Sequence, residues 1–167
     1  MADTVIVHPN RDKAESHATR AAVMLLLLTS AGLTALITIG GWSRLAGAQA
    51  VAVATVLVYL LMAFYVGRWN RGVLPVAAAF GILMGILAAV AAPGWFDRDK
   101  TGFANPAIQP SVLGLLTVIL IPVCLLLIAF AMRGFQQKWN VEVEVAREDA
   151  ESGRPRDFEG GEPTPAG

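Results

Sequence analysis

The segment between the third and fourth apolar blocks carries the side chains best suited to chemistry. Residues 97–102, with the sequence DRDKTG, place oxygen-bearing side chains at alternate positions and end in glycine. This spacing matches the first half of a calcium-binding loop, which takes oxygen ligands at positions one, three and five and glycine at position six. Position twelve requires a carboxylate, but this chain has Ile108 there. Because basic residues also neutralise the two acids, the segment favours a solvated turn, and we predict no metal site.

Part of the same segment matches a phosphorylation motif. Residues 99–102, DKTG, repeat the start of the motif in which P-type ATPases accept phosphate on an aspartate. The match ends at Phe103, and the apolar blocks leave no room for a nucleotide-binding domain. We therefore attribute the match to chance.

The four long apolar blocks lack the side chains that membrane catalysis or ion transport uses. None contains Asp, Glu, Lys, Arg or His, and both histidines, His8 and His17, lie near the N-terminus. Proton relays, voltage sensors and charge-coupled carriers need such groups within the membrane, and haem needs an axial ligand such as histidine. The single cysteine, Cys124, lies within an apolar block, where a thiol is unreactive. We therefore predict no catalytic residue, no cofactor, no metal and no enzymatic activity.

Each apolar block is long enough to cross a bilayer. A helix needs about 20 mostly apolar residues to span the hydrocarbon core, and its backbone groups have to be hydrogen-bonded within the segment. The sequence predicts transmembrane helices at residues 21–40, 45–66, 72–92 and 111–132. Indole rings prefer the membrane interface, and one tryptophan follows each block: Trp42, Trp69, Trp95 and Trp139.

The expected fold class is an all-α integral membrane protein, built as a four-helix transmembrane bundle. Gly-Trp follows the first and third blocks, and Trp-Asn follows the second and fourth. These paired dipeptides leave open a duplication of two tandem hairpins. We expect a transmembrane domain at 21–140, a cytoplasmic N-terminal segment at 1–20 and a disordered, acidic cytoplasmic tail at 141–167.

The basic residues predict the orientation, because lysine and arginine accumulate in short cytoplasmic flanks. Seven such residues flank the blocks on the side of the termini, against three on the other side. Both termini are therefore expected in the cytoplasm. Arginine outnumbers lysine ten to three, which indicates a GC-rich bacterial source and hence a multi-pass protein of a bacterial plasma membrane.

Small residues recur at four-residue spacing along the third block. They lie on one face of a helix and let a second helix approach closely. This ladder either packs within the bundle or forms a seam with a second copy or another membrane chain. Its members are Ala77, Gly81, Gly85 and Ala89.

The outer loop predicted at residues 93–110 is the longest segment between blocks. Loops of this length without an element of their own are often functional, and this one combines aromatic residues, alternating charges and three prolines. We expect a partner protein to contact it through Trp95, Phe96, Asp97, Asp99 and Phe103.

The tails carry two signals of secondary structure. Residues 12–20 are expected to extend the first helix into the cytoplasm. Residues 141–145, VEVEV, alternate strictly, as is typical of a strand. This segment either adds to the edge of a partner's sheet or serves as an extended linker.

No motif identifies a function. By analogy with small helical subunits of membrane machines, we expect an accessory or assembly subunit of a larger membrane complex. The alternative is a small homo-oligomeric channel or transporter for neutral solutes. Ser30, Thr34 and Thr38 share one face of the first block and either form hydrogen bonds between helices or line such a path. The expected partners are the lipid bilayer and other membrane chains or the protein itself. The net charge of zero indicates no nucleic acid.

Overall fold

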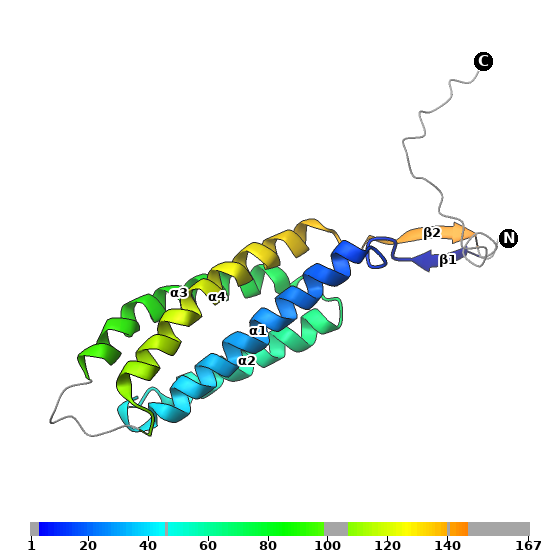
Figure 1. The fold of residues 1–167 in the computed structure, drawn as a ribbon. Coiled ribbons are helices and arrows are strands. Elements are labelled where there is room, and N and C mark those ends of the chain that lie inside the picture. Colours follow the sequence, from blue (N-terminus) through cyan, green and yellow to red (C-terminus); the bar gives the residue numbers. More distant parts are fainter. Residues whose placement is uncertain (1–3, 46, 99–106, 140, 147–167) are drawn as a thin grey trace, which may run out of the picture.

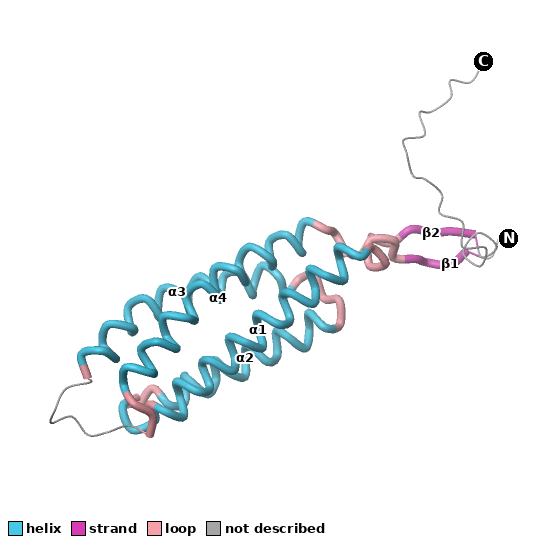
Figure 2. Tube along the Cα trace, viewed as in Figure 1, coloured by secondary structure: helices cyan, strands magenta, loops and turns pink. Residues whose placement is uncertain are grey.

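The computed structural model describes residues 4–45, 47–98, 107–139 and 141–146. The chain forms a bundle of four helices with a small two-stranded sheet beyond one end (Figure 1; Figure 2). The expected all-α, four-helix fold is confirmed. In chain order the elements are β1 (Thr4–Val7), α1 (Ala14–Gly40), the short 3-10 helix η1 (Trp42–Arg44), α2 (Gln49–Gly67), α3 (Val73–Asp97), α4 (Pro110–Gln136) and β2 (Val143–Ala146).

All four helices are long and apolar enough to cross a membrane. The shortest, α2, has 19 residues. At 1.5 Å per residue this gives a length of about 28 Å, close to the thickness of the hydrocarbon core. Many large aliphatic side chains point outward, for example Leu25, Leu83 and Val90, as contact with lipid requires. α1 begins at Ala14, so the residues before the first apolar block extend this helix as expected.

The helices form two hairpins, α1–α2 and α3–α4. α3 packs closely on α4, and α1 contacts both α2 and α4, whereas α2 and α3 make few contacts. Figure 1 shows the two hairpins as two layers. Because α2 and α3 make few contacts, the bundle is least closed along its α2–α3 side. We call the end at which α1 begins and α4 ends the strand end, and the opposite end the distal end.

The strand half of the bundle has a continuous core. Buried side chains from all four helices fill it, including Leu27, Tyr59, Leu74 and Leu127. The Tyr59 hydroxyl lies 3.9 Å from the Sγ atom of Cys124 and joins α2 to α4. A smaller buried cluster lies nearer the distal end.

The third helix ends later than the sequence predicts. The predicted span stops at residue 92, but α3 continues through Pro93 to Asp97. Proline removes one helical hydrogen bond, and burial of Trp95, which is only 5% exposed, offsets this local loss. The Trp95 ring packs on Gly41, where an added Cβ would lie 2.5 Å from Trp95 Cη2. Tertiary packing thus extends α3, and the segment that joins it to α4 is shorter than the predicted loop.

The two ends of the chain pair with each other. β1 and β2 form an antiparallel sheet in which Val5 lies opposite Val145 and Val7 lies opposite Val143. The expected disordered tail at 141–167 includes the alternating residues 141–145 that predict a strand, and the structure has the strand β2 there. Residues 147–167 lie outside the described residues. This pairing requires both termini to emerge on the same side of the bundle.

The two hairpins differ at the positions of their repeated dipeptides. After α2 and again after α4, one residue has a left-handed backbone conformation. These residues are Trp69, with φ of 62°, and Lys138, with φ of 48°. The tryptophan itself has this conformation in the first hairpin, but Trp139 comes one position later in the second. Trp42 is half-exposed whereas Trp95 is buried. The dipeptides therefore occupy different structural positions, and duplication stays a hypothesis.

Candidate functional site

The ladder of small residues lies largely at the contact between α3 and α4. Ala77 and Gly81 are buried, and an added Cβ at Gly81 would lie 3.2 Å from Cγ1 of Ile128 on α4. At Gly85 it would lie 3.5 Å from Cβ of Cys124. Ala89 is exposed. Gly81 and Gly85 thus allow close approach of α4, whereas Ala77 is buried in the core. A seam with another chain stays a prediction.

The residues expected to contact a partner in the outer loop occupy different environments. Trp95 is buried in α3, Phe96 is 46% exposed, and Asp97 is the last residue of the helix. The Phe96 ring covers Gly114 of α4, where an added Cβ would lie 2.8 Å from Cζ of the ring. Asp99 and Phe103 lie outside the described residues. Trp95 therefore packs inside the chain, and Phe96 joins α3 to α4.

An aromatic cluster closes the bundle at the strand end. Trp69, after α2, stacks edge-to-face on Trp139, after α4, with ring centroids 5.4 Å apart. His17 of α1 makes a second edge contact with Trp69 at 5.0 Å, and the Arg20 guanidinium lies 4.5 Å from the centre of that ring. Such cation–π contacts are stabilising. Three of the four helices are joined here by aromatic side chains.

Hydrogen bonds connect this cluster to the chain around it. The Trp139 indole N–H donates to Oε1 of Gln137 at 3.0 Å, and the Gln137 amide donates to the Thr19 hydroxyl at 3.0 Å. Arg71 donates to the Phe135 carbonyl at 2.7 Å and stacks over the same ring at 4.2 Å. Trp139 is fully buried, so its polar atom needs this partner.

The same cluster holds the two-stranded sheet in place. Between β1 and α1, the Arg11 guanidinium donates to the Trp139 carbonyl at 3.2 Å, and the Asn10 amide donates to the Lys138 carbonyl at 3.2 Å. His8 lies 3.5 Å from the Glu142 carboxylate. These contacts tie the N-terminal connection to the C-terminal one. The segment between β1 and α1 and the segment between α4 and β2 therefore contact each other, and these contacts hold the sheet against the bundle.

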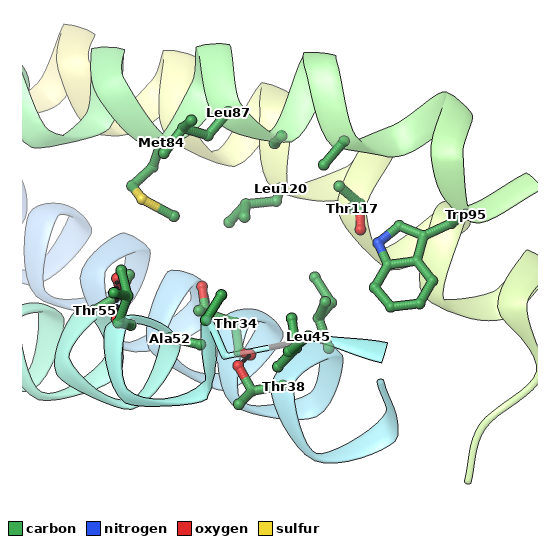
Figure 3. A pocket seen from close by; sticks show the side chains of 15 residues that line it. Thr34, Thr38, Leu45, Ala52, Thr55, Met84, Leu87, Trp95, Thr117 and Leu120 are labelled. Atoms are coloured by element: carbon green, nitrogen blue, oxygen red, sulfur yellow. Dashed lines mark hydrogen bonds between the residues drawn. The ribbon is translucent and has the colours of Figure 1, made fainter. Parts of the chain in front are cut away.

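A cavity of about 240 Å³ lies between the hairpins in the distal half. All four helices line it, and Figure 3 shows Thr34 and Ala52 on one wall with Met84, Leu120 and Trp95 on the other. No charged residue is among the described residues that line it. The cavity lies on the side where α2 and α3 make few contacts. We call it the distal cavity.

Four threonines line the distal cavity, and one of them differs from the rest. Thr38, Thr55 and Thr117 donate their hydroxyl protons to carbonyls one turn earlier in their own helices, at 2.7–2.9 Å. The Oγ1 atom of Thr34 is buried and has no hydrogen-bond partner within the described chain. Thr38 and the neighbouring Ser30 thus bond within α1, and Thr34 presents an unsatisfied hydroxyl.

The described residues form two candidate binding sites. Among the described residues, no group of three His, Cys, Asp or Glu side chains could hold a metal ion. Cys124 is buried beside Tyr59, away from solvent. The strand end offers polar backbone groups and basic side chains, and the distal cavity offers apolar surface with hydroxyl groups. These are two separate candidate sites.

Comparisons with protein families, curated proteins and solved structures find no match for this chain. Both candidate sites are therefore interpreted from their own residues. Sequence reasoning missed the pairing of the termini, although three β-branched residues at 5–7 directly after Thr4 are a strand signal that could have found it. The distal cavity has no comparable signal, because it depends on which helices pair.

Proposed function

We propose that this protein is a non-catalytic subunit of a larger complex in a bacterial plasma membrane, and that it binds a cytoplasmic segment of its partner through the β1–β2 sheet. The observation that supports this proposal is a short sheet with an unpaired edge on each strand within the described chain. Two isolated strands are marginally stable in water, and such edges accept a further strand from another protein.

The sheet is presented in a fixed position. It projects beyond the end of the bundle (Figure 1). In this position the helices do not cover it, and it lies outside the part of the bundle that lipid would surround. Arg11 and Asn10 hold its connections to the backbone beside Trp139. A preorganised strand edge loses less conformational entropy on binding than a mobile one. This favours recognition of an extended segment over a role as a passive linker.

The exposed side chain of the first strand suits an apolar contact. Ile6, in the middle of β1, is 55% exposed, and it lies opposite Glu144 in the register. A partner strand that pairs with β1 would bury Ile6 while its backbone completes the hydrogen bonds of the edge. An extended segment with alternating apolar residues fits this surface.

The charge distribution supports a cytoplasmic location for this sheet. Seven lysines and arginines flank the spans on the side of the termini, against three on the distal side, and basic flanks stay in the cytoplasm. The partner segment is therefore sought on the cytoplasmic side. Cysteine labelling at Ile6 and at Gly47 with a membrane-impermeant reagent tests this orientation, and labelling of Ile6→Cys in intact cells would contradict it.

The decisive experiment is mild-detergent extraction of the tagged protein from its own host, followed by quantitative mass spectrometry. We expect a partner in fixed ratio with the wild type and with Ile6→Val, which keeps both the β-branching and the apolar surface of the side chain. Ile6→Pro removes a backbone N–H and disrupts the strand, so the partner should be lost. A partner that survives Ile6→Pro refutes docking through the sheet. A homo-oligomer without other chains refutes the subunit proposal, and the channel or transporter alternative then becomes testable by solute flux in liposomes.

A further inference from the structure

We infer that the distal cavity binds a small, neutral, lipid-soluble molecule that carries a hydroxyl or carbonyl group on a body of about ten carbon atoms. This site lies in the bundle, away from the sheet, and does not depend on the proposed docking. Three properties of the cavity support the inference: its unsatisfied hydroxyl, its size and neutrality, and its opening toward the membrane.

The Thr34 hydroxyl is the polar anchor of this site. Its side chain is 8% exposed, and its oxygen has no hydrogen-bond partner within the described chain. A buried polar group without a partner is costly and is usually paired in folded proteins. Because the neighbouring Thr38 already donates to the Thr34 carbonyl at 2.7 Å, it does not satisfy the Thr34 side chain. Because this oxygen is buried, the Thr34 side chain has to turn toward the cavity for a ligand oxygen to supply the missing bond.

A second polar group faces the cavity from the other hairpin. In Figure 3 the indole nitrogen of Trp95 lies on the side of the ring toward the cavity. Its N–H donates no hydrogen bond to another described residue, although its ring contacts Arg98 at 5.4 Å. Thr34 and Trp95 thus offer hydrogen-bonding groups on opposite walls of an otherwise apolar space.

The size and lining of the cavity define the class of ligand. Cavities of about 150 Å³ hold one benzene molecule, and the distal cavity has about 240 Å³, which by proportion suits roughly ten carbon atoms. A transmembrane helix, about 10 Å across, is too wide to enter. A charged ligand would lack a counter-ion among the described residues, because none of those that line the cavity is charged. The occupant is therefore small and neutral.

The cavity opens between α2 and α3 into the region occupied by lipid. Val51 of α2 and Leu87 of α3 both line it and are both more than half exposed. Thr34 lies six residues before the end of α1 at Gly40, about 9 Å below that end at 1.5 Å per residue. This depth favours a molecule dissolved in the bilayer over the headgroup of a phospholipid.

Binding is tested with the full chain in nanodiscs and two probes, 10-bromo-1-decanol and 1-bromodecane. Bromine quenches tryptophan fluorescence on contact, so entry into the cavity quenches Trp95. We expect saturable quenching by both probes, with the alcohol binding about fivefold more tightly, as one neutral hydrogen bond allows. Trp95→Phe should abolish the saturable component and so identify its source.

Matched variants separate the hydrogen bond from the cavity itself. Thr34→Val, which keeps the shape of the side chain, should weaken binding of the alcohol to that of 1-bromodecane. Thr117→Val is the control, because its hydroxyl already donates to the Leu113 carbonyl, and the fivefold preference should remain. Ala52→Leu fills the cavity and should remove saturable quenching by both probes. Equal affinities for both probes in the wild type, or quenching that never saturates, would overturn the inference.

Discussion

Replacing Gly41 with alanine is expected to destabilise the bundle, because the added methyl group has no room. Its Cβ would lie 2.5 Å from Cη2 of Trp95 and 2.9 Å from the Ile37 carbonyl oxygen. The backbone at Gly41 has φ of −98°, which alanine adopts readily, so any loss of stability comes from these contacts. Overpacking of this kind costs about 2 kcal/mol, which for a chain of this length lowers Tm by roughly 4–8 °C.

The matched control is Gly32→Ala in the same hairpin. An added Cβ at Gly32 meets no atom within 4 Å, and alanine favours helix over glycine by about 1 kcal/mol. Thermal unfolding of the purified protein in one detergent, followed by circular dichroism, should therefore show the two variants shifting Tm in opposite directions. A Gly41→Ala protein as stable as the wild type would refute the reasoning.

A double-mutant cycle shows whether the Trp95 ring is the cause. Trp95→Phe removes the outer part of the indole, including the Cη2 and Cζ2 atoms that the added methyl group of Gly41→Ala would meet. In that background only the contact with the Ile37 carbonyl oxygen remains. Gly41→Ala should therefore cost about 1 kcal/mol less than in the wild type, because contacting sites are not additive. An equal cost in both backgrounds would mean that the Trp95 ring is not the cause of the destabilisation.

Three further perturbations distinguish parts of the structure. Gly114→Ala should lower Tm less than Gly41→Ala, since the Phe96 ring that it meets at 2.8 Å is partly exposed and can turn away; the same unfolding assay compares them, and the reverse order would contradict this. Trp139→Ala should cost about 3–5 kcal/mol because the side chain is fully buried, whereas a similar loss for the half-exposed Trp42→Ala would show that burial is not the reason. Arg71→Lys should destabilise by about 1 kcal/mol, because lysine retains the charge but not the planar group that bonds the Phe135 carbonyl and stacks on its ring; chemical denaturation measures the difference, and an unchanged midpoint would show that charge alone suffices.

The four helices were predictable because lipid imposes a simple rule on sequence. Every span has to be long, apolar and internally hydrogen-bonded, and the four apolar blocks satisfy this rule without help from distant residues. The end of α3 was not predictable in the same way. Pro93 and Gly94 are local signals for a helix end, and the contact between Trp95 and Gly41 that overrides them joins residues far apart in sequence.

The candidate sites were less accessible to sequence reasoning than the spans. The small-residue ladder predicts a face suited to close packing. Gly81 and Gly85 lie against α4, but spacing alone does not identify the helix that they meet. The alternating residues near 143 indicate a strand, whereas its partner lies at the opposite end of the chain. The role of Thr34 depends on its hydroxyl having no hydrogen-bond partner within the described chain. That property follows from how the helices pack, including the few contacts between α2 and α3, and it cannot be read from the sequence.

The pairing of β1 with β2 also has a consequence for how the protein is made. β1 leaves the ribosome early, and β2 follows after all four spans, roughly 7–28 s later at ordinary rates of synthesis. If one span failed to insert, β2 would remain on the other face of the membrane, where β1 could not reach it. The finished sheet is therefore absent from chains in which one span has failed to insert, and a partner that recognises it would reject those copies.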